Sequence, residues 1–284
     1  MNGVIVINKE KNYTSRDVVN IIGKHFNTKK IGHTGTLDPI ATGVLVLCMG
    51  TSLKLVEMLM DHDKEYIAKI KLGIETDTLD ITGQIIKQKE VPDLTKKNIE
   101  EVLNSFKGKI KQQVPIYSAI KVNGKKLYEY ARNNEQVDLP IKEVEIYDIN
   151  LISDIIDNGF YIKCHVSSGT YIRSLIRDIG YKLGTVAIME ELERTSLGKF
   201  KIEDSYTVDE VNNNNYKLLD IKEVVDLPLV KVDEELEKRI LNGQVLKRFF
   251  DEDKVMILNS KDEVIAIYQQ KDNEYVKPYR MFIK

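Results

Sequence analysis

Residues 29–50 read KKIGHTGTLDPIATGVLVLCMG, a glycine-rich loop that leads directly into an apolar run of strand length. The loop carries one acid, Asp38, immediately before a proline. Loops that bind nucleoside triphosphates end in Gly-Lys-Ser/Thr, and dinucleotide-binding loops have the spacing Gly-x-Gly-x-x-Gly. This loop has neither pattern, which argues against nucleotide hydrolysis. Asp38 is then either a turn residue bonded to the backbone or a catalytic carboxylate.

Around this loop, strand and helix patterns follow one another without a regular βαβ order. Apolar runs or period-2 alternation predict strands at 4–8, 43–50, 65–73, 141–152 and 160–166. In the third of these, Tyr66 falls on the same face as core residues. Helical spacing is present at 15–26, 95–107 and 171–183. The order predicts an α+β or mixed-sheet fold.

The chain is expected to have two domains. Residues 205–226 are polar and acidic and include four consecutive asparagines at 212–215, which favours a boundary there. Beyond it, two apolar strand-like runs flank an Asn-Ser-Lys-Asp turn, as in a small β module. We therefore expect domains at 1–220 and 221–284.

Composition narrows the class of protein. No apolar run reaches the length of about 18–20 residues that a membrane span needs, and a signal peptide is not recognisable, so a cytoplasmic protein is expected. The four histidines and two cysteines lack metal-ligand spacing, and no Gly-x-Ser-x-Gly elbow is present. We expect no metal and no cofactor, which leaves a carboxylate to do the chemistry.

The net charge is −2, but the charge is unevenly distributed. Residues 105–133 contain seven basic residues against one acid, with three tyrosines interspersed. That composition suits a surface that binds a phosphate backbone and stacks on bases, although a lysine-rich window is more often a solvated face. The lysines are Lys107, Lys109, Lys111, Lys121, Lys125 and Lys126. An Asn-Gly pair at 123–124 predicts a hairpin within this window.

Arg173 lies in the first turn of the helix predicted at 171–183, after Thr170 as a plausible N-cap. The helix dipole disfavours a cation there by roughly 0.3–1 kcal/mol unless an anion is close. An acid or a phosphate is therefore the expected partner, and an arginine beside Asp38 would lower the pKa of that carboxyl. The alternative is that Arg173 only covers the helix end at the surface.

Five segments, in this order and spacing, resemble the bacterial tRNA pseudouridine synthase B (TruB) family. They are KKIGHTGTLDPIATGVLVLCMG (29–50), KEYIAKIKLGIETDTLDITG (64–83), QQVPIYSAIKVNGKKLYEYAR (112–132), VSSGTYIRSLIRDIG (166–180) and LERTSLGKF (192–200). Five ordered motifs are far more specific than one glycine-rich loop. The resemblance implies a mixed, largely antiparallel central sheet with flanking helices, followed by a small PUA-like RNA-binding module.

The resemblance also implies an activity, the conversion of the uridine at position 55 of the tRNA T-loop to pseudouridine without a cofactor. Asp38 matches the nucleophile of the family, which would attack either carbon 6 of the base or carbon 1 of the ribose. Arg173 matches the arginine that pairs with it. Tyr66 matches the tyrosine that stacks on the base and is a candidate general base.

Further matches concern RNA binding. His33 matches a loop histidine that contacts displaced T-loop nucleotides, with a plain turn residue as the alternative. Tyr171 and Leu192 match residues that line the uridine pocket, though both would suit a core. The window at about 105–135 resembles an RNA-clamping insertion, so its lysines, together with Lys64 of the Lys-x-Tyr motif, are expected to contact RNA. The base must be extruded from its stack before reaction.

Two other functions remain open at this stage. One is a non-catalytic protein that binds or folds tRNA on the same scaffold, which would need the basic window but not the set of Asp38, Tyr66 and Arg173. The other is a guide-RNA-dependent synthase, which would ordinarily have a longer tail. The short C-terminal module favours a monomer that acts alone on tRNA, without a guide RNA or an obligate protein partner.

Overall fold

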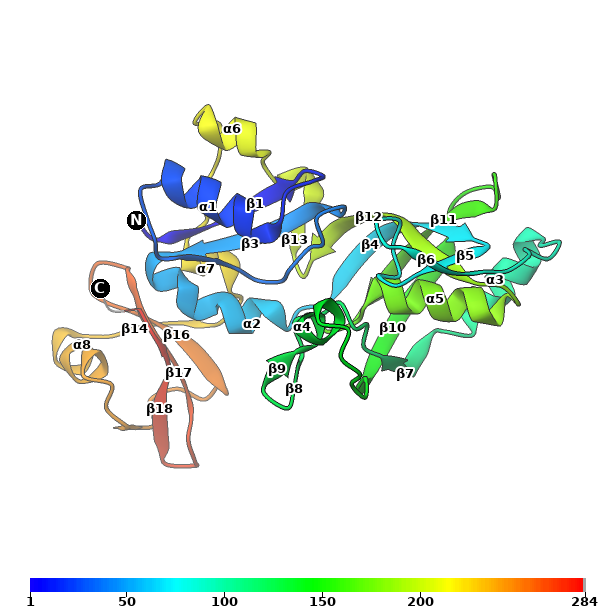
Figure 1. Cartoon of the computed structure of the whole chain (residues 1–284). Coiled ribbons are helices and arrows are strands. Elements are labelled where there is room, and N and C mark those ends of the chain that lie inside the picture. The colour runs from blue at the N-terminus through cyan, green and yellow to red at the C-terminus, as the bar shows by residue number, and fades with distance from the viewer. Residues whose placement is uncertain (283–284) are drawn as a thin grey trace.

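The computed structural model describes residues 1–282, and its largest unit is a nine-stranded sheet (Figure 1). The main path runs β1-β3-β12-β4-β11-β10-β7, with β2 beside β3 and β13 beside β12. The strands are β1 (Gly3–Lys9), β2 (Ile31–His33), β3 (Thr42–Met49), β4 (Lys64–Leu72), β7 (Gly108–Gln113), β10 (Ile141–Leu151), β11 (Gly159–Val166), β12 (Ala187–Leu197) and β13 (Phe200–Lys201).

The sheet is mixed but largely antiparallel, which confirms the predicted α+β class. Strand β12 pairs with β3 in parallel at Glu193 and Arg194. It pairs with β4 in antiparallel orientation along nearly its whole length. In β4, buried and half-buried residues alternate, so that Tyr66 and Ala68 face the core as the period-2 pattern predicts. The first residues of β4 and the last residues of β12 therefore meet beside the start of β3.

Helices cover one face of this sheet and enclose the larger core with it. Thr14 and Thr95 cap the first two of these helices through capping boxes. The predicted cap of α5 is wrong: Tyr171 is the N-cap, because the side-chain amide of Gln112 pairs with the backbone N–H and C=O of Tyr171. The helices on this face are α1 (Ser15–His25), α3 (Lys96–Asn104), α5 (Ile172–Lys182) and α6 (Val208–Asn212).

The first part of the basic window, with Lys109 and Lys111, is strand β7 of the large sheet, and only the part between β7 and β10 projects as an insertion (Figure 1). Its hairpin joins β8 (Lys121–Val122) to β9 (Lys125–Lys126). Asn123 and Gly124 both have positive φ, 51° and 82°, as the Asn-Gly signal predicts. The short helix α4 (Leu127–Arg132) follows the hairpin.

The C-terminal residues form a second, five-stranded sheet. Its own core begins at Val232, whereas Ile221 and Val224 pack on the other face of the large sheet. Arg280 and Glu57 form an ion pair of 2.6 Å across the junction. The elements of this part are α7 (Ile221–Val224), β14 (Leu229–Lys231), α8 (Glu234–Leu241), β15 (Leu246–Lys247), β16 (Lys254–Leu258), β17 (Val264–Gln270) and β18 (Tyr275–Met281).

Short elements complete the connections. They are η1 (Gly50–Leu55), α2 (Val56–Met60), β5 (Ile74–Thr76), β6 (Ile85–Gln88) and η2 (Ile202–Asp204). Strands β5 and β6 form a separate two-stranded ribbon whose loop returns to the start of α5.

Helix α5 lies unusually close to β12 because Gly180 has no side chain. A Cβ at Gly180 would lie 2.6 Å from the Ala187 Cβ and 2.7 Å from the Ala187 nitrogen. We expect Gly180→Ala to lower the free energy of unfolding by about 1–3 kcal/mol, although the same change ordinarily stabilises a helix. Chemical denaturation followed by circular dichroism measures this. Glu100→Ala, on the exposed side of α3, is the control; a Gly180→Ala protein as stable as wild type would contradict the close approach.

Candidate active site

The loop that carries Asp38 is fixed through its backbone. The Ser15 hydroxyl accepts from the Leu37 N–H at 2.9 Å and donates to the Leu37 carbonyl at 3.2 Å. The Asn12 N–H donates to the Pro39 carbonyl, and the Ala41 N–H donates to the Asp38 carbonyl. The backbone is thus held on both sides of Asp38, while a third of its side-chain surface stays exposed.

Arg173 lies beside this carboxylate from the first turn of α5. Its Nε is 3.0 Å from Oδ2 of Asp38, and its Nη2 is 3.4 Å from Oδ1. The same guanidinium donates to the carbonyls of Thr78 at 2.9 Å and Tyr117 at 3.0 Å. The arginine is 7% exposed, so the anion that its position at the helix start requires is supplied by the protein.

A second acid, Asp80, completes the cluster and was missed by sequence reasoning. It is 5% exposed, and its Oδ2 lies 3.9 Å from Nη1 of Arg173. Its Oδ1 accepts from the hydroxyl of Thr78 at 2.8 Å and from both the N–H and the hydroxyl of Thr82. The signal in the sequence is an acid with a threonine two residues away on each side, in TDTLDIT.

The electrostatic balance at Asp38 differs from the one expected for a simple ion pair. Burial raises the pKa of the Asp38 carboxyl above its usual value. The charge of Arg173 opposes this, Asp80 adds to it, and Lys9 opposes it more weakly. The pKa therefore rises, because removal of water outweighs the attraction of the arginine. A carboxylate that is poorly solvated is also a stronger nucleophile and base.

Of the residues predicted for the pocket, Tyr66 and Tyr171 lie close enough to Asp38 for its charge to affect the pKa of their phenols. Leu192 and His33 are placed by their own strands, β12 and β2. Tyr66 in β4 is 7% exposed, and Leu192 in β12 is 8% exposed; both belong to the main core cluster. Tyr171 is half-buried and directly precedes α5, two residues from Arg173. His33 is half-buried at the end of β2, where its Nδ1 accepts from the Gly35 N–H, and burial lowers its pKa.

Two buried cations, Lys9 and Arg194, donate hydrogen bonds to the backbone of the Asp38 loop. Lys9 is fully buried and its Nζ donates to carbonyls, including that of Tyr13 at 2.7 Å and that of Pro39 at 3.4 Å. Burial lowers the pKa of Lys9 to about 8. Arg194 in β12 is 1% exposed and donates to the carbonyls of Val44 and Gly35. Neither residue was predicted to support the loop. Lys9 ends a largely apolar strand, whereas Arg194 stands among Glu190, Glu191 and Glu193 in β12, where nothing in the sequence marks it as buried.

The predicted RNA-contacting lysines fall into three groups. Lys64 points inward: it is 8% exposed, its Nζ donates to the carbonyls of Met60 and His62, and burial lowers its pKa to about 8. Three others have acidic partners: Lys107 with Asp148, Lys109 with Glu143, and Lys125 with Glu135.

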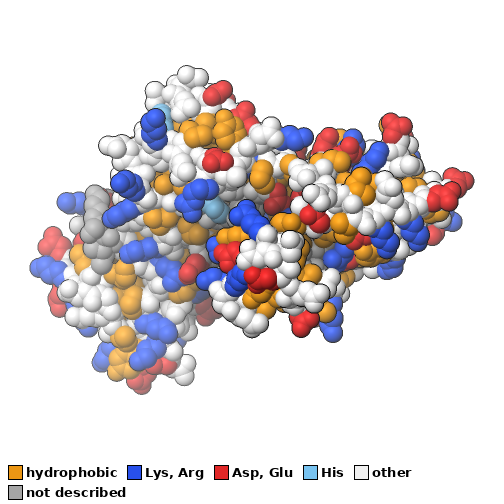
Figure 2. All heavy atoms as spheres, viewed as in Figure 1, with side chains coloured by type: hydrophobic (Ala, Val, Ile, Leu, Met, Phe, Trp, Pro, Cys, Tyr) orange, Lys and Arg blue, Asp and Glu red, His pale blue; other side chains and the backbone are white. Residues whose placement is uncertain are grey.

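The remaining lysines, Lys111, Lys121 and Lys126, form no ion pair within residues 1–282. Lys126 lies over the ring of Tyr128, and Lys125 lies over that of Tyr130. Figure 2 shows basic side chains over the face that carries the insertion, mixed with acidic ones. The basic window is therefore positively charged with partial compensation, and Tyr128 and Tyr130 are covered by cations, whereas the Tyr117 hydroxyl bonds to Asp77.

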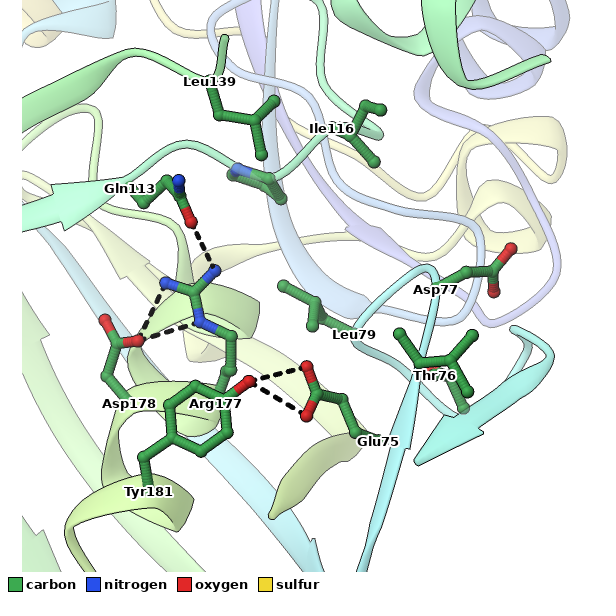
Figure 3. Close-up of a pocket in the computed structure, with 12 residues that line it drawn as sticks. Glu75, Thr76, Asp77, Leu79, Gln113, Ile116, Leu139, Arg177, Asp178 and Tyr181 are labelled. Carbon is green, nitrogen blue, oxygen red and sulfur yellow. Dashed lines mark hydrogen bonds and ion pairs between the residues drawn. The ribbon is translucent and has the colours of Figure 1, made fainter. Parts of the chain in front are cut away.

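A cavity of about 310 Å³ is lined by residues of β5, α5 and the end of β7, among them Glu75, Arg177 and Gln113 (Figure 3). Arg177 in its wall pairs with Asp178 at 2.8 Å and with the side chain of Gln113. The Tyr181 hydroxyl donates to the Glu75 carboxylate. These contacts tie α5 to β7 and β5, and so stiffen the frame behind the catalytic pair.

Within residues 1–282, no group of three or more His, Cys, Asp or Glu side chains is arranged to hold a metal ion. None of the helices in the same range combines the length and the apolar character that a membrane crossing requires.

Two family models match consecutive parts of the chain. Residues 23–172 match the TruB family pseudouridylate synthase N-terminal domain, and residues 173–240 match the tRNA pseudouridylate synthase B C-terminal domain. The join between the two models falls at the start of α5.

Curated relatives named tRNA pseudouridine synthase B match along the whole chain. The protein of Oceanobacillus iheyensis is 44% identical, covering 99% of this chain and 98% of the relative. The protein of Caldanaerobacter subterraneus is 41% identical, covering 99% of each, and that of Staphylococcus aureus is 42% identical with the same coverage.

Solved structures share the fold. A structure described as a Cbf5-Nop10-Gar1 complex superposes with a TM-score of 0.73 at 26% identity, covering 99% of this chain and 85% of that chain. An H/ACA ribonucleoprotein bound to a substrate RNA containing 2'-deoxyuridine superposes with a TM-score of 0.71 at 25% identity and the same coverage. Both confirm the predicted architecture of a catalytic sheet followed by a β-rich module.

The raised pKa of Asp38 has a consequence for stability. A carboxyl whose pKa is raised by folding costs stability once it ionises, and this cost appears as the pH rises through the folded-state pKa. Asp38→Asn should therefore melt at a higher temperature than wild type near neutral pH, by about 2–4 °C for each 1 kcal/mol of relief. Arg173 would keep its two carbonyl partners and Asp80 in the variant.

Differential scanning calorimetry across pH 4–8 measures this difference. The gap between the two melting temperatures should close toward acid pH, where the wild-type carboxyl is protonated. A wild type that melts above Asp38→Asn at neutral pH would mean that the ion pair with Arg173 outweighs the cost of burial.

Proposed function

Because this chain belongs to the TruB family of pseudouridylate synthases, we propose that it converts the uridine at position 55 of the tRNA T-loop to pseudouridine, with Asp38 as nucleophile and no cofactor. The isomerisation of uridine in tRNA follows from the family and from relatives that match the full chain. Beyond that, we propose position 55 as the target uridine and the roles of the individual residues.

One observation carries the assignment of Asp38: its carboxylate is the exposed member of a buried cluster of charges. Arg173 fixes both of its oxygens, at 3.0 and 3.4 Å, so the attacking atom is placed before the substrate arrives. The raised pKa favours bond formation by the ionised form, because water does not compete for it. Attack at carbon 6 of the base and attack at carbon 1 of the ribose both start from this geometry.

Asp80 has the role of a positioning residue. Its Oδ1 is saturated by Thr78 and Thr82, so only Oδ2 faces Arg173. Arg173 is thereby shared between two acids, which weakens its hold on Asp38 enough for that oxygen to leave and bond to carbon.

The extruded base would lie between the residues that surround the Asp38 carboxylate. Tyr66 offers an aromatic face for stacking and a hydroxyl for proton removal, while Tyr171 and Leu192 close the sides of the pocket. His33, held by the Gly35 N–H and neutral at physiological pH, would contact the nucleotides displaced with the target.

The insertion at 105–135 would hold the T-arm. Lys111, Lys121 and Lys126 offer the phosphate contacts, with the ion-paired lysines Lys107, Lys109 and Lys125 contributing less. Lys64 is left out of this surface, because its ammonium group is engaged by the carbonyls of Met60 and His62. The β-rich residues 221–284 form the PUA-like second RNA-binding module of the proposal.

The protein would act alone, as a monomer, without a guide RNA or a protein partner. The catalytic groups that the reaction requires all come from this one chain. A tRNA substrate also places its work in the cytoplasm. Retention of Asp38, Tyr66 and Arg173 in one cluster argues for catalysis over simple tRNA binding, which needs none of the three.

Replacement of the nucleophile separates binding from chemistry. Asp38→Asn should bind an unmodified tRNA transcript like wild type but form pseudouridine at least about 10³-fold more slowly, since no other group can form the covalent bond. Filter retention measures binding, and tritium release from [5-³H]uridine-labelled tRNA measures turnover. A transcript with position 55 replaced by cytidine tests the position. Wild-type protein that binds tRNA but forms no pseudouridine would show a binding or folding factor instead.

The role of the insertion predicts a salt effect. Lys111→Ala combined with Lys121→Ala should weaken tRNA binding and reduce the slope of log Kd against log salt by about 1.4–1.8, the loss of two phosphate contacts. The rate at saturating tRNA should be unchanged. Lys97→Ala on α3, whose side chain is 84% exposed, is the matched control. An unchanged salt slope in the double variant would remove these lysines from the RNA surface.

A further inference from the structure

Arg194 is a buried cation whose partners do not explain its charge. It is the largest side chain among the fully buried residues, at 1% exposure. Within residues 1–282 it forms no ion pair with a carboxylate, and its hydrogen bonds to the backbone go to two carbonyls. A buried charge is strongly disfavoured unless it is compensated, so an arginine used only to bind carbonyls would be a costly choice.

The Arg194 side chain bonds to the backbone on both sides of Asp38, at Gly35 and at Val44. Its Nε donates to the Val44 carbonyl at 2.7 Å, and its Nη2 donates to the Gly35 carbonyl at 3.2 Å. The backbone also fits closely here: a Cβ on Gly43 would lie 2.3 Å from the Arg194 carbonyl oxygen. Any shift of Arg194 would therefore be felt at both ends of the catalytic loop.

The same side chain faces Tyr66. The two residues are directly opposite each other in the β4–β12 pairing, where side chains on one face are neighbours. Burial raises the pKa of Tyr66, and the charge and hydrogen bonding of Arg194 are the largest opposing influences. The other titratable groups that face the phenol are Cys164 from β11 and Asp38 from its loop, and both raise the pKa. Arg194 is thus the one cation among the groups that act on Tyr66.

We propose that Arg194 is a positioning residue for both catalytic side chains: it fastens the Asp38 loop at Gly35 and Val44 and serves as the counter-cation of Tyr66 when that phenol removes a proton. The proposal rests on the proposed pseudouridine synthase activity. The missing anion of Arg194 is then the Tyr66 phenolate, which forms only for the reaction.

The proton balance of the reaction requires such a base. After carbon 5 of the base has bonded to carbon 1 of the ribose, carbon 5 still carries its original hydrogen. The Tyr66 phenol first gives its own proton to solvent. The C5–H bond then breaks, its electron pair restores the C5–C6 double bond, and the proton passes to the Tyr66 phenolate oxygen. If Asp38 was bonded to carbon 1, the C6–N1 double-bond pair moves to N1 in the same step. N1, which lost its bond to the ribose, takes up a proton from solvent, so the overall change is an isomerisation. If Asp38 was bonded to carbon 6, it leaves in this step.

Four variants test the proposal: Arg194→Met, Arg194→Lys, Tyr66→Phe and Lys9→Met. Lys9→Met is the matched control, because Lys9 is also a buried cation bonded to the Asp38 loop but does not act on Tyr66. Protein labelled with [ζ-¹³C]tyrosine reports the titration of each phenol by NMR, and the Tyr66 signal is the one missing from Tyr66→Phe. This measurement does not depend on activity.

In Arg194→Met the Tyr66 phenol should titrate at least about one pH unit higher than in wild type. Arg194→Lys should restore most of the difference because it keeps the charge, and it remains informative if Arg194→Met does not fold. Lys9→Met should leave the Tyr66 titration unchanged. In single-turnover reactions at saturating tRNA, Arg194→Met should be slowed about 10²-fold near neutral pH and recover partly at higher pH, as loss of general-base strength requires.

An unchanged Tyr66 titration in folded Arg194→Met would overturn the counter-cation role, even if the rate falls. An equal shift in Lys9→Met would also overturn it, because the effect would then come from general disturbance of the loop. If wild-type protein forms no pseudouridine at all, the proposed function fails separately, and the NMR titration still decides whether Arg194 controls Tyr66.

Discussion

The guanidinium of Arg173 joins segments that are far apart in the chain, and the active site depends on it. It contacts the Asp38 carboxylate, the Thr78 carbonyl, the Tyr117 carbonyl and, at 3.9 Å, the Asp80 carboxylate. These groups belong to the glycine-rich loop, the ribbon after β4 and the base of the insertion. A planar group with five N–H donors can serve all of them at once, which a lysine could not.

Burial of charge is the recurring device in this protein. Lys9, Lys64 and Arg194 are buried and Asp38 is partly buried, and burial shifts the pKa of Asp38, Lys9 and Lys64. Each cation is satisfied largely by backbone carbonyls, so the charge remains available to act on the reacting groups. Burying these charges costs stability and leaves fixed charges in a dry environment.

Local patterns in the sequence predict local structure well here. The alternation in β4 and the Asn123-Gly124 turn both follow from interactions within a few residues. The ordered motifs also predict that Arg173 pairs with Asp38, as it does in the structure. Features that depend on distant partners were not predictable: Gln112 displaces the expected cap of α5, and Lys64 turns inward to carbonyls. The raised pKa of Asp38 likewise depends on burial, which no spacing in the sequence encodes.

The face of the large sheet opposite the helices α1, α3, α5 and α6 is covered by the C-terminal part of the chain. Val4, Val6, Val44 and Val46 form one core with residues from the C-terminal sheet, including Met256 and Ile267. The C-terminal part is thus the cover of that face. A nonsense mutation between the codons for the two sheets would leave an open hydrophobic surface on the translated product, which favours aggregation or proteolysis over a smaller working enzyme. Selection to keep the catalytic half soluble would then preserve the C-terminal half, whatever it contributes to RNA binding.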